Sequence, residues 1–345
     1  MAIRLLTNFR HLESIIERLE SKYGSQTSIE LVPATGLLRA VRTCYKMIKT
    51  HILLLNVEEA LLLRLCLFKY IFPFNPCLIL SVDLILRAPT NAKQRLACRL
   101  KGLLLKKVDL FILYHKDVSG YLKYFGINPT KCFYVPFKIN HFREIQEWLS
   151  EQNESSDPAD GKYVIAAGRS MRDLKTYIDA MAQTKLPGIL LRQDKKILAE
   201  NGTYLENGRL PSNLKEIVDH GGENSFIDYM RKARIIVIPR FKRDINATGI
   251  GTYLMAMAMG KCVIISHGPG ATELLKNGEA ILVPPEDSDY LAEAIQKAWQ
   301  EADFRRKIAS NGQRYALSLK DERRLLEDMM HASLDLLTSR IECAK

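Results

Sequence analysis

Short apolar runs alternate with longer amphipathic stretches along most of the chain. The runs are rich in Ile, Leu and Val and are apolar at nearly every position, as in strands buried on both faces of a sheet. Because each run is followed by a segment with helical periodicity, right-handed crossovers and a doubly wound parallel sheet are predicted. In residues 1–150 the predicted strands are 3–6, 28–32, 51–55, 77–82, 108–114 and 132–135, and the predicted helices are 10–23, 36–50, 58–71, 91–107 and 117–125.

A second αβ alternation follows a polar boundary. Residues 147–162 contain Pro and Gly among polar side chains and cannot bury a core face. Beyond them the predicted strands are 163–167, 188–192, 214–218, 234–239, 262–265 and 280–283, and the predicted helices are 174–183, 226–232, 254–259, 272–276, 289–300, 303–315 and 321–343. We expect an N-terminal domain at 1–148, a linker at 149–162, a C-terminal domain at 163–318 and a terminal helical segment at 319–345 that packs back across both.

One turn of the second domain has the composition of an anion site. The sequence Thr248-Gly249-Ile250-Gly251-Thr252 lies between the strand at 234–239 and the start of the next helix. Backbone N–H groups and the positive end of the helix dipole suit a phosphate at such a position. The alternative is that the two glycines only allow the helix to pack on the sheet.

Cations follow two strands of the same domain. Gly168 and Arg169 come directly after the strand at 163–167, and Lys175 lies in the helix that follows. Because neighbouring parallel strands end at one edge of a sheet, these side chains are predicted to converge on a diphosphate there. Arg172 and Asp173 have the alternative of pairing with each other. The strand at 234–239 is followed by three further cations, Arg240, Lys242 and Arg243.

The first domain offers one carboxylate at its ligand-binding edge. Asp83 follows the strand at 77–82, where a carboxylate can serve as a base or as the partner of an acceptor hydroxyl. It can equally be a loop or helix-capping aspartate. His115, after the next strand, is a weaker candidate and can be a half-buried polar residue without chemical role.

The excess of positive over negative charge lies entirely in the first half of the chain. The net charge is +11; residues 1–150 carry 22 Lys and Arg against 11 Asp and Glu, whereas residues 151–345 carry 28 of each. Such asymmetry suggests an anionic partner for the first domain, either a membrane surface or nucleic acid. No nucleic-acid-binding motif or basic–aromatic platform is present, so we expect no nucleic acid.

Two helices hold most of this charge. In the helix at 36–50, four cations recur at spacings of three and four and share one face: Arg39, Arg42, Lys46 and Lys49. In the helix at 91–107, cations surround an apolar stripe of Leu96, Leu100, Leu103 and Leu104. We expect the four cations of the helix at 36–50 to contact an anionic membrane. The alternative is an ordinary solvated helix face.

The cysteines and the hydropathy favour a reducing compartment. The seven cysteines show no metal-ligand spacing, which favours free thiols and no metal site. The N-terminus enters a strand without a signal-peptide pattern, and no apolar run reaches the roughly 20 residues that a membrane-spanning helix needs. A cytoplasmic protein, peripheral on the inner face of the cytoplasmic membrane, is expected.

Several motifs together resemble a known family. AAGR at 166–169, IP at 238–239, AMAMGKCVI at 256–264 and ATELLKNGEAILVPPED at 271–287 occur in this order, and YFGINPTKCFYVPFKIN at 124–140 precedes them. They resemble GT-B-fold glycosyltransferases, in particular family 4 (glycosyl transferases group 1). The resemblance implies an α/β GT-B fold of two doubly wound domains facing a cleft. It also implies retaining transfer of a sugar from a nucleotide-sugar donor, with no metal or other cofactor.

The resemblance also assigns roles to residues. Arg169 and Lys175 would neutralise the departing diphosphate, and Asp83 would lie near the acceptor, a saccharide or a lipid-linked molecule in polysaccharide or glycolipid synthesis. Glu273 matches a family glutamate near the donor, although a helix-start carboxylate is an equal alternative. The expected donor-binding residues are Gly168, Arg169, Lys175, Thr248, Gly249, Gly251, Thr252 and Glu273.

The chain departs from the family at two carboxylate positions. The family has two glutamates eight positions apart, which contact the sugar and the ribose of the donor; Ala247 and Met255 stand there. The family's glycine-rich loop after the first strand is also replaced, by Thr7-Asn-Phe-Arg10. Because of these departures, the sequence does not specify the nucleotide or the sugar of the donor. They also allow an alternative function, that of a catalytically inactive GT-B-fold binding or scaffold protein at a membrane surface.

Overall fold

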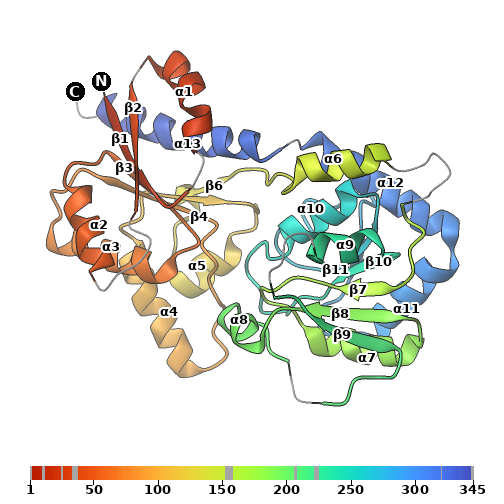
Figure 1. Cartoon of the computed structure of the whole chain (residues 1–345). Coiled ribbons are helices and arrows are strands. Elements are labelled where there is room, and N and C mark those ends of the chain that lie inside the picture. Colours follow the sequence, from red (N-terminus) through yellow and green to blue (C-terminus); the bar gives the residue numbers. More distant parts are fainter. Residues whose placement is uncertain are drawn as a thin grey trace. The chain divides into compact units, whose positions relative to one another are not determined.

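The computed structural model describes residues 2–9, 12–24, 26–32, 38–151, 158–205, 208–220, 225–319 and 321–342 (Figure 1). The chain forms two compact units: Met1–Pro136 with Arg323–Lys345, and Phe137–Glu322. The chain therefore leaves the first unit after Pro136 and returns to it for its last helix.

The first unit contains a six-stranded parallel sheet of order β2-β1-β3-β4-β5-β6. The central strands β3 and β4 are buried on both faces, which explains their uninterrupted apolar runs. The strands are β1 (Ile3–Thr7), β2 (Thr27–Leu31), β3 (Ile52–Asn56), β4 (Leu78–Val82), β5 (Leu110–Leu113) and β6 (Cys132–Tyr134).

Helices connect these strands, and the final helix of the chain joins them. Arg340 of that helix pairs with Asp109 at 3.0 Å, and Glu327 pairs with Arg18 at 2.7 Å, so the terminal helix packs on the first unit. The helices are α1 (Ile16–Tyr23) after the 3-10 turn η1 (Leu12–Ile15), α2 (Arg39–Met47), α3 (Glu59–Ile71), α4 (Ala92–Leu105), α5 (Ser119–Phe125), the 3-10 turn η2 (Pro129–Lys131) and α13 (Glu322–Glu342).

The second unit contains a parallel sheet of order β12-β11-β10-β7-β8-β9. Its strands are β7 (Val164–Ala166), β8 (Gly188–Arg192), β9 (Leu214–Val218), β10 (Ile235–Ile238), β11 (Cys262–Ser266) and β12 (Ile281–Val283). Its helices are α6 (Phe142–Glu151), α7 (Leu174–Thr184), α8 (Lys195–Glu200), α9 (Ser225–Arg231), α10 (Ile250–Ala258), α11 (Ser288–Gln300) and α12 (Ala302–Ser318).

The core of the second unit fixes the ends of its central strands. Alternate residues of β7, β10 and β11 join one apolar cluster with α7 and α11. Within it, the buried Tyr177 hydroxyl donates to the carbonyls of Val164 and Ile189 at 3.0 and 3.1 Å and so ties α7 to β7 and β8. The fold prediction of two doubly wound parallel-sheet units is confirmed.

Some predicted boundaries differ from the structure. Residues 137–148, assigned by sequence to the first domain, group with the second unit, because Phe137 and Asn140 lie against Gly251 and α6 contacts α10. Part of the expected linker, 149–151, continues α6, and 152–157 lie outside the described residues. The same holds for the predicted helix starts at 10 and 36 and for Cys343.

The predicted helix at 272–276 is wrong. Residues 269–274 form turns instead, with left-handed backbone at Gly270. The Thr272 hydroxyl accepts a hydrogen bond from the N–H of Gly268 at 2.9 Å and so holds a loop conformation. Helix α8 was not predicted, and α6 fell partly in the expected linker, because only one described residue in each is buried.

Candidate functional site

Three glycines line the carboxyl ends of the neighbouring strands β7, β10 and β11. Gly168, Gly249 and Gly268 have φ of +107°, +94° and +154°. A Cβ atom at Gly168 or Gly249 would crowd the guanidinium of Arg172, and one at Gly268 would crowd that of Arg240. The glycines therefore provide backbone conformations that L side chains disfavour and also the space that two arginine side chains occupy.

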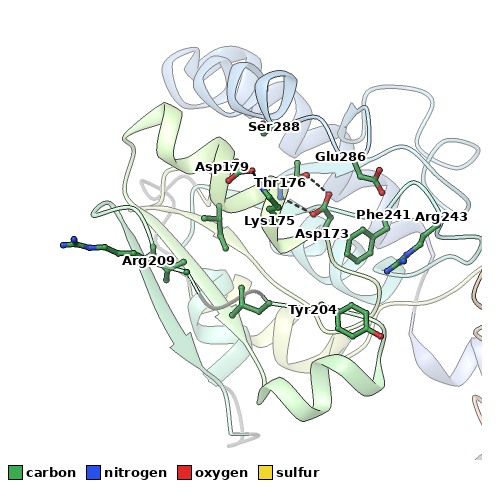
Figure 2. Close-up of a pocket in the computed structure, with 14 residues that line it drawn as sticks. Asp173, Lys175, Thr176, Asp179, Tyr204, Arg209, Phe241, Arg243, Glu286 and Ser288 are labelled. Carbon is green, nitrogen blue, oxygen red and sulfur yellow. Dashed lines mark hydrogen bonds and ion pairs between the residues drawn. The ribbon is translucent and has the colours of Figure 1, made fainter. Parts of the chain in front are cut away.

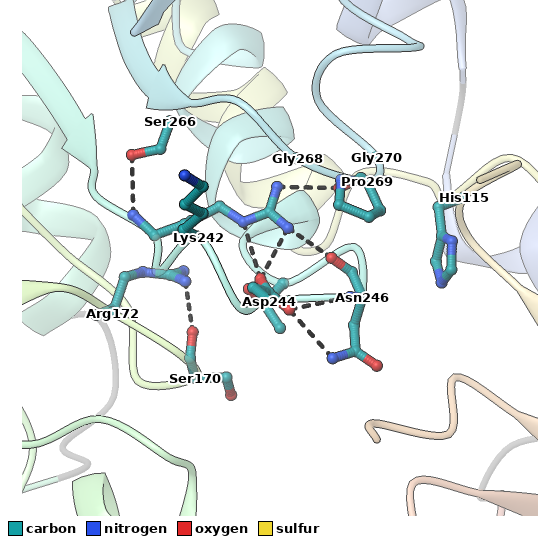
Figure 3. A network of polar contacts seen from close by, with 12 residues as sticks. His115, Ser170, Arg172, Lys242, Asp244, Asn246, Ser266, Gly268, Pro269 and Gly270 are labelled. Carbon is teal, nitrogen blue, oxygen red and sulfur yellow. Dashed lines mark hydrogen bonds and ion pairs between the residues drawn. The ribbon is translucent and has the colours of Figure 1, made fainter. Parts of the chain in front are cut away.

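Arg240 ties the loops after β10 and β11 together, within the network of polar contacts around Asp244 that Figure 3 shows. Its Nε and Nη2 donate to the Asp244 carboxylate at 2.9 and 2.7 Å, and both side chains are 1% exposed. Nη1 donates to the carbonyl of Pro269 at 2.9 Å, and Nη2 also donates to the carbonyl of Asn246 at 2.5 Å. Both donors meet the same oxygen, Oδ2, and this buried, charge-assisted pair holds the loops after β10 and β11 in one arrangement.

Asp244 extends this network to the start of α10. One carboxylate oxygen accepts from the Thr248 hydroxyl, and the other accepts from the backbone N–H and the amide of Asn246 at 3.0 and 3.1 Å. The predicted donor residue Thr248 is thus buried, with its hydroxyl proton directed at Asp244. Its position is fixed by the network beneath it.

Arg172 lies beside this network but has only carbonyl partners. Its Nε donates to the Ala167 carbonyl at 3.1 Å and its Nη1 to the Ser170 carbonyl at 2.6 Å. Across the described residues, Nη2 has no hydrogen-bond acceptor. Burial and the neighbouring charge of Arg240 lower the pKa of Arg172 to about 10, although Asp244 opposes that shift.

The suggested pairing of Arg172 with Asp173 is wrong. The Asp173 carboxylate instead caps α7, accepting from the N–H and the hydroxyl of Thr176 at 3.2 and 2.5 Å. The backbone of Arg172 forms an isolated antiparallel β-bridge with the backbone of Arg240. The guanidinium groups of Arg172 and Arg240 are both buried, and the carboxylate of Asp244 pairs with Arg240, so positive charge is in excess at this edge of the sheet.

The start of α10 adjoins these side chains. Gly249 caps the helix in the left-handed conformation. In the described chain, the first-turn N–H groups of Gly251 and Thr252 have no backbone acceptor, as is usual for a helix start. A Cβ at Gly251 would approach Asn140 and Phe137 to 3.2 and 3.5 Å, so this glycine also serves chain packing, the alternative left open by the sequence.

Lys175 lies at a pocket of about 650 Å³ (Figure 2). It is in the first turn of α7 and pairs with Asp179 at 2.5 Å. Aromatic rings, cations and carboxylates line the pocket together, among them Tyr204, Phe241, Arg243 and Glu286. The pocket adjoins the arginine network, because two of its lining residues directly follow the two arginines in sequence: Asp173 follows Arg172, and Phe241 follows Arg240.

Glu286 of this pocket has a strained backbone. Its φ is +62°, a conformation that is rare for a glutamate. Its carboxylate accepts from the N–H of Lys242 at 3.0 Å, which joins the loops after β10 and β12. The sequence had not singled out Glu286, because only its backbone conformation and its neighbours distinguish it from other surface glutamates.

The other predicted donor residues lie at the same sheet edge in different settings. Arg169 is exposed, and no partner for its side chain is found among the described residues. Glu273 lies in the turns that replace the predicted helix, where it accepts from the N–H of Gly270 at 3.3 Å. Arg169 is thus available for a ligand, whereas Glu273 shapes its own loop.

The candidate residues of the first unit follow neighbouring strands. Asp83 comes directly after β4 with φ of +47°, and its N–H donates to the carbonyl of Ile112 at 2.9 Å. His115 follows β5, is buried, and its Nδ1 lies 2.8 Å from the carbonyl oxygen of Asp117. Both sit at the carboxyl edge of the sheet, and their chemical roles stay predictions.

The basic residues of α2 do not share one environment. Arg39 pairs with Glu58 at 2.8 Å and Lys46 with Glu30 at 2.6 Å, and both cations are less than one-third exposed. Arg42 and Lys49 are exposed. The predicted face of four free cations is therefore split between two ion-paired and two exposed side chains.

The described part of the chain contains no group of three or more His, Cys, Asp or Glu side chains arranged to hold a metal ion. Its six described cysteines are free thiols. No helix in the described ranges is long and apolar enough to cross a membrane.

Comparison with known proteins agrees with this architecture. Residues 162–301 match the family model described as glycosyl transferases group 1. Among curated proteins, no sequence match was found. These 140 residues include the arginine network, the start of α10 and the pocket.

Solved structures match over both units. HepE from Anabaena in complex with UDP has a TM-score of 0.64 at 15% identity, covering 97% of this chain and 100% of that one. Sucrose-phosphate synthase from Thermosynechococcus elongatus has a TM-score of 0.65 at 15% identity, covering 98% and 100%. For the α,α-trehalose 6-phosphate synthase from Burkholderia multivorans the TM-score is 0.64 at 10% identity, and both chains are covered completely.

At such low sequence identity these structures establish only the GT-B fold. The family match places residues 162–301 of the second unit among the glycosyl transferases of group 1. The chain is therefore a transferase of the glycosyltransferase class, with a group 1 domain at residues 162–301 and the GT-B fold over its whole length.

Proposed function

We propose that this glycosyltransferase moves a sugar from a nucleotide-sugar donor to a saccharide or lipid-linked acceptor, in polysaccharide or glycolipid synthesis. The proposal includes retention of the anomeric configuration and independence from metal ions. The UDP complex of HepE, a protein of the same fold, makes UDP-sugars the first donors to test.

The observation that carries the donor site is the buried guanidinium of Arg172. A buried charge without a counter-charge is costly, and Arg172 has carbonyl partners only. A diphosphate beside Nη2 would supply the missing negative charge. The adjacent start of α10 offers the N–H groups of Gly251 and Thr252 to the same anion.

The remaining predicted residues take roles around that diphosphate. Arg169 and Lys175 neutralise the charge that develops on the leaving group, for which Lys175 exchanges its pairing with Asp179. Gly168 and Gly249 allow the backbone to approach the diphosphate closely. Thr248 fixes the start of α10, and Glu273 fixes the loop after β11. Asp83 of the first unit is the carboxylate on the acceptor side.

The pocket beside Lys175 suits the nucleoside of the donor. The rings of Tyr204 and Phe241 provide stacking surfaces, and Glu286 provides a carboxylate for ribose hydroxyls. In the family this last role belongs to a glutamate, whose position holds the buried Met255 here. Glu286 would therefore replace that glutamate from a different loop.

Nucleotide binding tests the donor site directly. We expect UDP, GDP or ADP at millimolar concentration to raise the Tm of the protein, and we expect Arg172→Gln to weaken that binding by about tenfold or more. Arg305→Gln is a matched control, since Arg305 is also buried but pairs with Asp160 before β7. Equal nucleotide stabilisation of Arg172→Gln and the wild type would remove Arg172 from the site.

Transfer assays test the chemistry. The anomeric configuration of the product, read by NMR, distinguishes retention from inversion, and chelation with EDTA should leave turnover unchanged. Arg169→Ala should abolish turnover; full turnover of this variant would exclude Arg169 from the mechanism.

The burial of Ala247 and Met255 in the family's glutamate positions favours one alternative, a catalytically inactive binding or scaffold protein. Failure of every nucleotide to stabilise the protein would support this alternative. In either case we propose a cytoplasmic location with an anionic membrane surface as partner. The cations Arg39, Arg42, Lys46 and Lys49 were the expected contacts.

A further inference from the structure

Large apolar side chains are exposed where α3 ends. Tyr70, Ile71, Phe72 and Phe74 are all more than two-fifths exposed, and Phe74 is 97% exposed. The chain turns there from α3 towards β4, through the sequence Phe-Pro-Phe-Asn-Pro. Four such side chains within five residues form an apolar surface that water does not favour.

A second apolar stripe lies on the neighbouring α4. Leu96, Leu100 and Leu103, at spacings of four and three, are each more than half exposed. The Tyr70 hydroxyl donates to the carbonyl of Leu103 at 2.7 Å, and Lys107 lies over the Tyr70 ring at 4.4 Å. The exposed residues of α3 and α4 are therefore adjacent, and together we name them the α3–α4 apolar face.

Helix α2, which contacts α3, is also exposed on its apolar side. Val41, Tyr45 and Ile48 are all more than half exposed, and at helical spacing they lie on one side of the helix. Arg39 and Lys46 are turned to Glu58 and Glu30. The free side of α2 is thus apolar, and the cations that accompany it are Arg42 and Lys49.

The charge around the face is mainly positive. Residues 58–109, which contain all of α3 and α4, carry nine Lys and Arg against four acids, and two of these cations are ion-paired, Lys69 with Asp109 and Lys101 with Glu59. A second copy of this chain would bring the same positive charge against it. An anionic bilayer offers both an apolar interior for the aromatic and leucine side chains and negative headgroups for the cations.

We propose that the α3–α4 apolar face inserts into the surface of an anionic lipid bilayer, with the apolar side of α2 beside it. Apolar burial then supplies most of the binding, and Arg42, Lys49 and the cations of α4 add attraction to headgroups. The inference extends the membrane partner of the proposed function and changes its contact residues. Vesicle binding needs neither donor nor acceptor, so its failure would leave the donor site untouched.

Co-sedimentation of the full chain with vesicles tests this face. We expect binding to phosphatidylcholine vesicles that contain phosphatidylglycerol, with a part that survives high salt because it is apolar. The double variant Phe72→Ser/Phe74→Ser should bind about tenfold or more weakly, because two aromatic side chains no longer leave water. Its Tm should fall only slightly, since Phe74 is 97% exposed and Phe72 is 54% exposed, although the Phe72 ring packs on that of Phe68.

Tyr290→Ser is the matched control, because Tyr290 is an exposed aromatic residue of the second unit, and it should bind vesicles as the wild type does. Undiminished binding of the double variant would overturn the proposal. So would an absence of vesicle binding. A dimer in solution that dissociates in the double variant would instead identify a second copy as the occupant.

Discussion

The two units depart from the usual distribution of apolar and charged side chains in opposite directions. Of the twenty large apolar side chains exposed in the described part of the chain, sixteen belong to the first unit. Of the six buried Lys and Arg side chains found there, five belong to the second unit. One unit thus exposes apolar surface that a single folded chain normally buries, and the other buries charge that it normally exposes.

Both exceptions indicate ligands, but of different kinds. Covering an exposed apolar face with another apolar phase lowers the free energy, because the face leaves water. A buried cation is stabilised only by a nearby anion or a set of carbonyl groups. In the second unit the partners are partly internal, because Asp244 and several carbonyl oxygens satisfy Arg240 completely. Arg172, by contrast, donates to carbonyl oxygens and has no carboxylate partner among the described residues. In the first unit no such internal compensation exists for Phe74 or Leu96.

The largest expected effect comes from removing the internal anion of the second unit. Asp244→Asn leaves Arg240 buried without its carboxylate and should lower the free energy of unfolding by about 3–5 kcal/mol. Denaturant unfolding measures this change. Asp228→Asn, which breaks a partly exposed pair with Arg231, should lower stability much less. Equal effects of the two variants would mean that burial does not set the strength of the Arg240 pair.

A smaller effect distinguishes the two sides of α3. Leu65→Ala empties a fully buried site and should cost about 2–5 kcal/mol of stability, whereas Leu67→Ala, on the exposed side, should change it by less than about 0.5 kcal/mol. Equilibrium unfolding of both variants gives the comparison. A large loss for Leu67→Ala in the isolated chain would mean that this side of α3 is already covered without a partner.

The glycine beside Arg172 gives the next prediction. Gly168→Ala adds a Cβ that crowds Arg172 at a left-handed position, which should cost about 1–3 kcal/mol and weaken nucleotide binding as well. Gly208, which lines the pocket beside Lys175, has open space and no left-handed backbone, so without nucleotide Gly208→Ala should be neutral or slightly stabilising. Thermal unfolding with and without nucleotide separates the two effects. If both variants behave alike, the close approach of Arg172 to the backbone has no energetic weight.

The sequence predicted the fold well because strands buried on both faces leave an unambiguous pattern. The apolar run at 262–265 became β11 almost residue for residue, and the two sheets follow from the alternation alone. The short elements that failed, such as the helix expected at 272–276, bury little and are held by local hydrogen bonds to Gly268 and Gly270.

The site was harder to predict because sequence gives the position of a side chain along the chain but not its direction. The cations after β7 and β10 were correctly expected at one edge, yet nothing in the spacing showed that Arg172 turns inward while Arg169 stays exposed. On α2 the helical spacing grouped Arg39 with Lys46. It did not reveal that Glu58 and Glu30, from a neighbouring helix and strand, cover that side.

The smallest expected effect tests this last difference, between Lys46 of α2 and Lys49 in the turn that follows it. Lys49 is exposed beside the apolar side of the helix, and each Lys near an anionic surface adds about 1 kcal/mol of attraction. Lys49→Gln should therefore weaken binding to phosphatidylglycerol vesicles about fivefold at low salt and hardly at all at high salt. Lys46→Gln should have much less effect at either salt concentration, because Lys46 is already paired with Glu30. Equal losses would mean that this pair opens on the membrane, which would restore the four-cation face predicted from the spacing of α2 and reduce the share of binding that the apolar side chains supply.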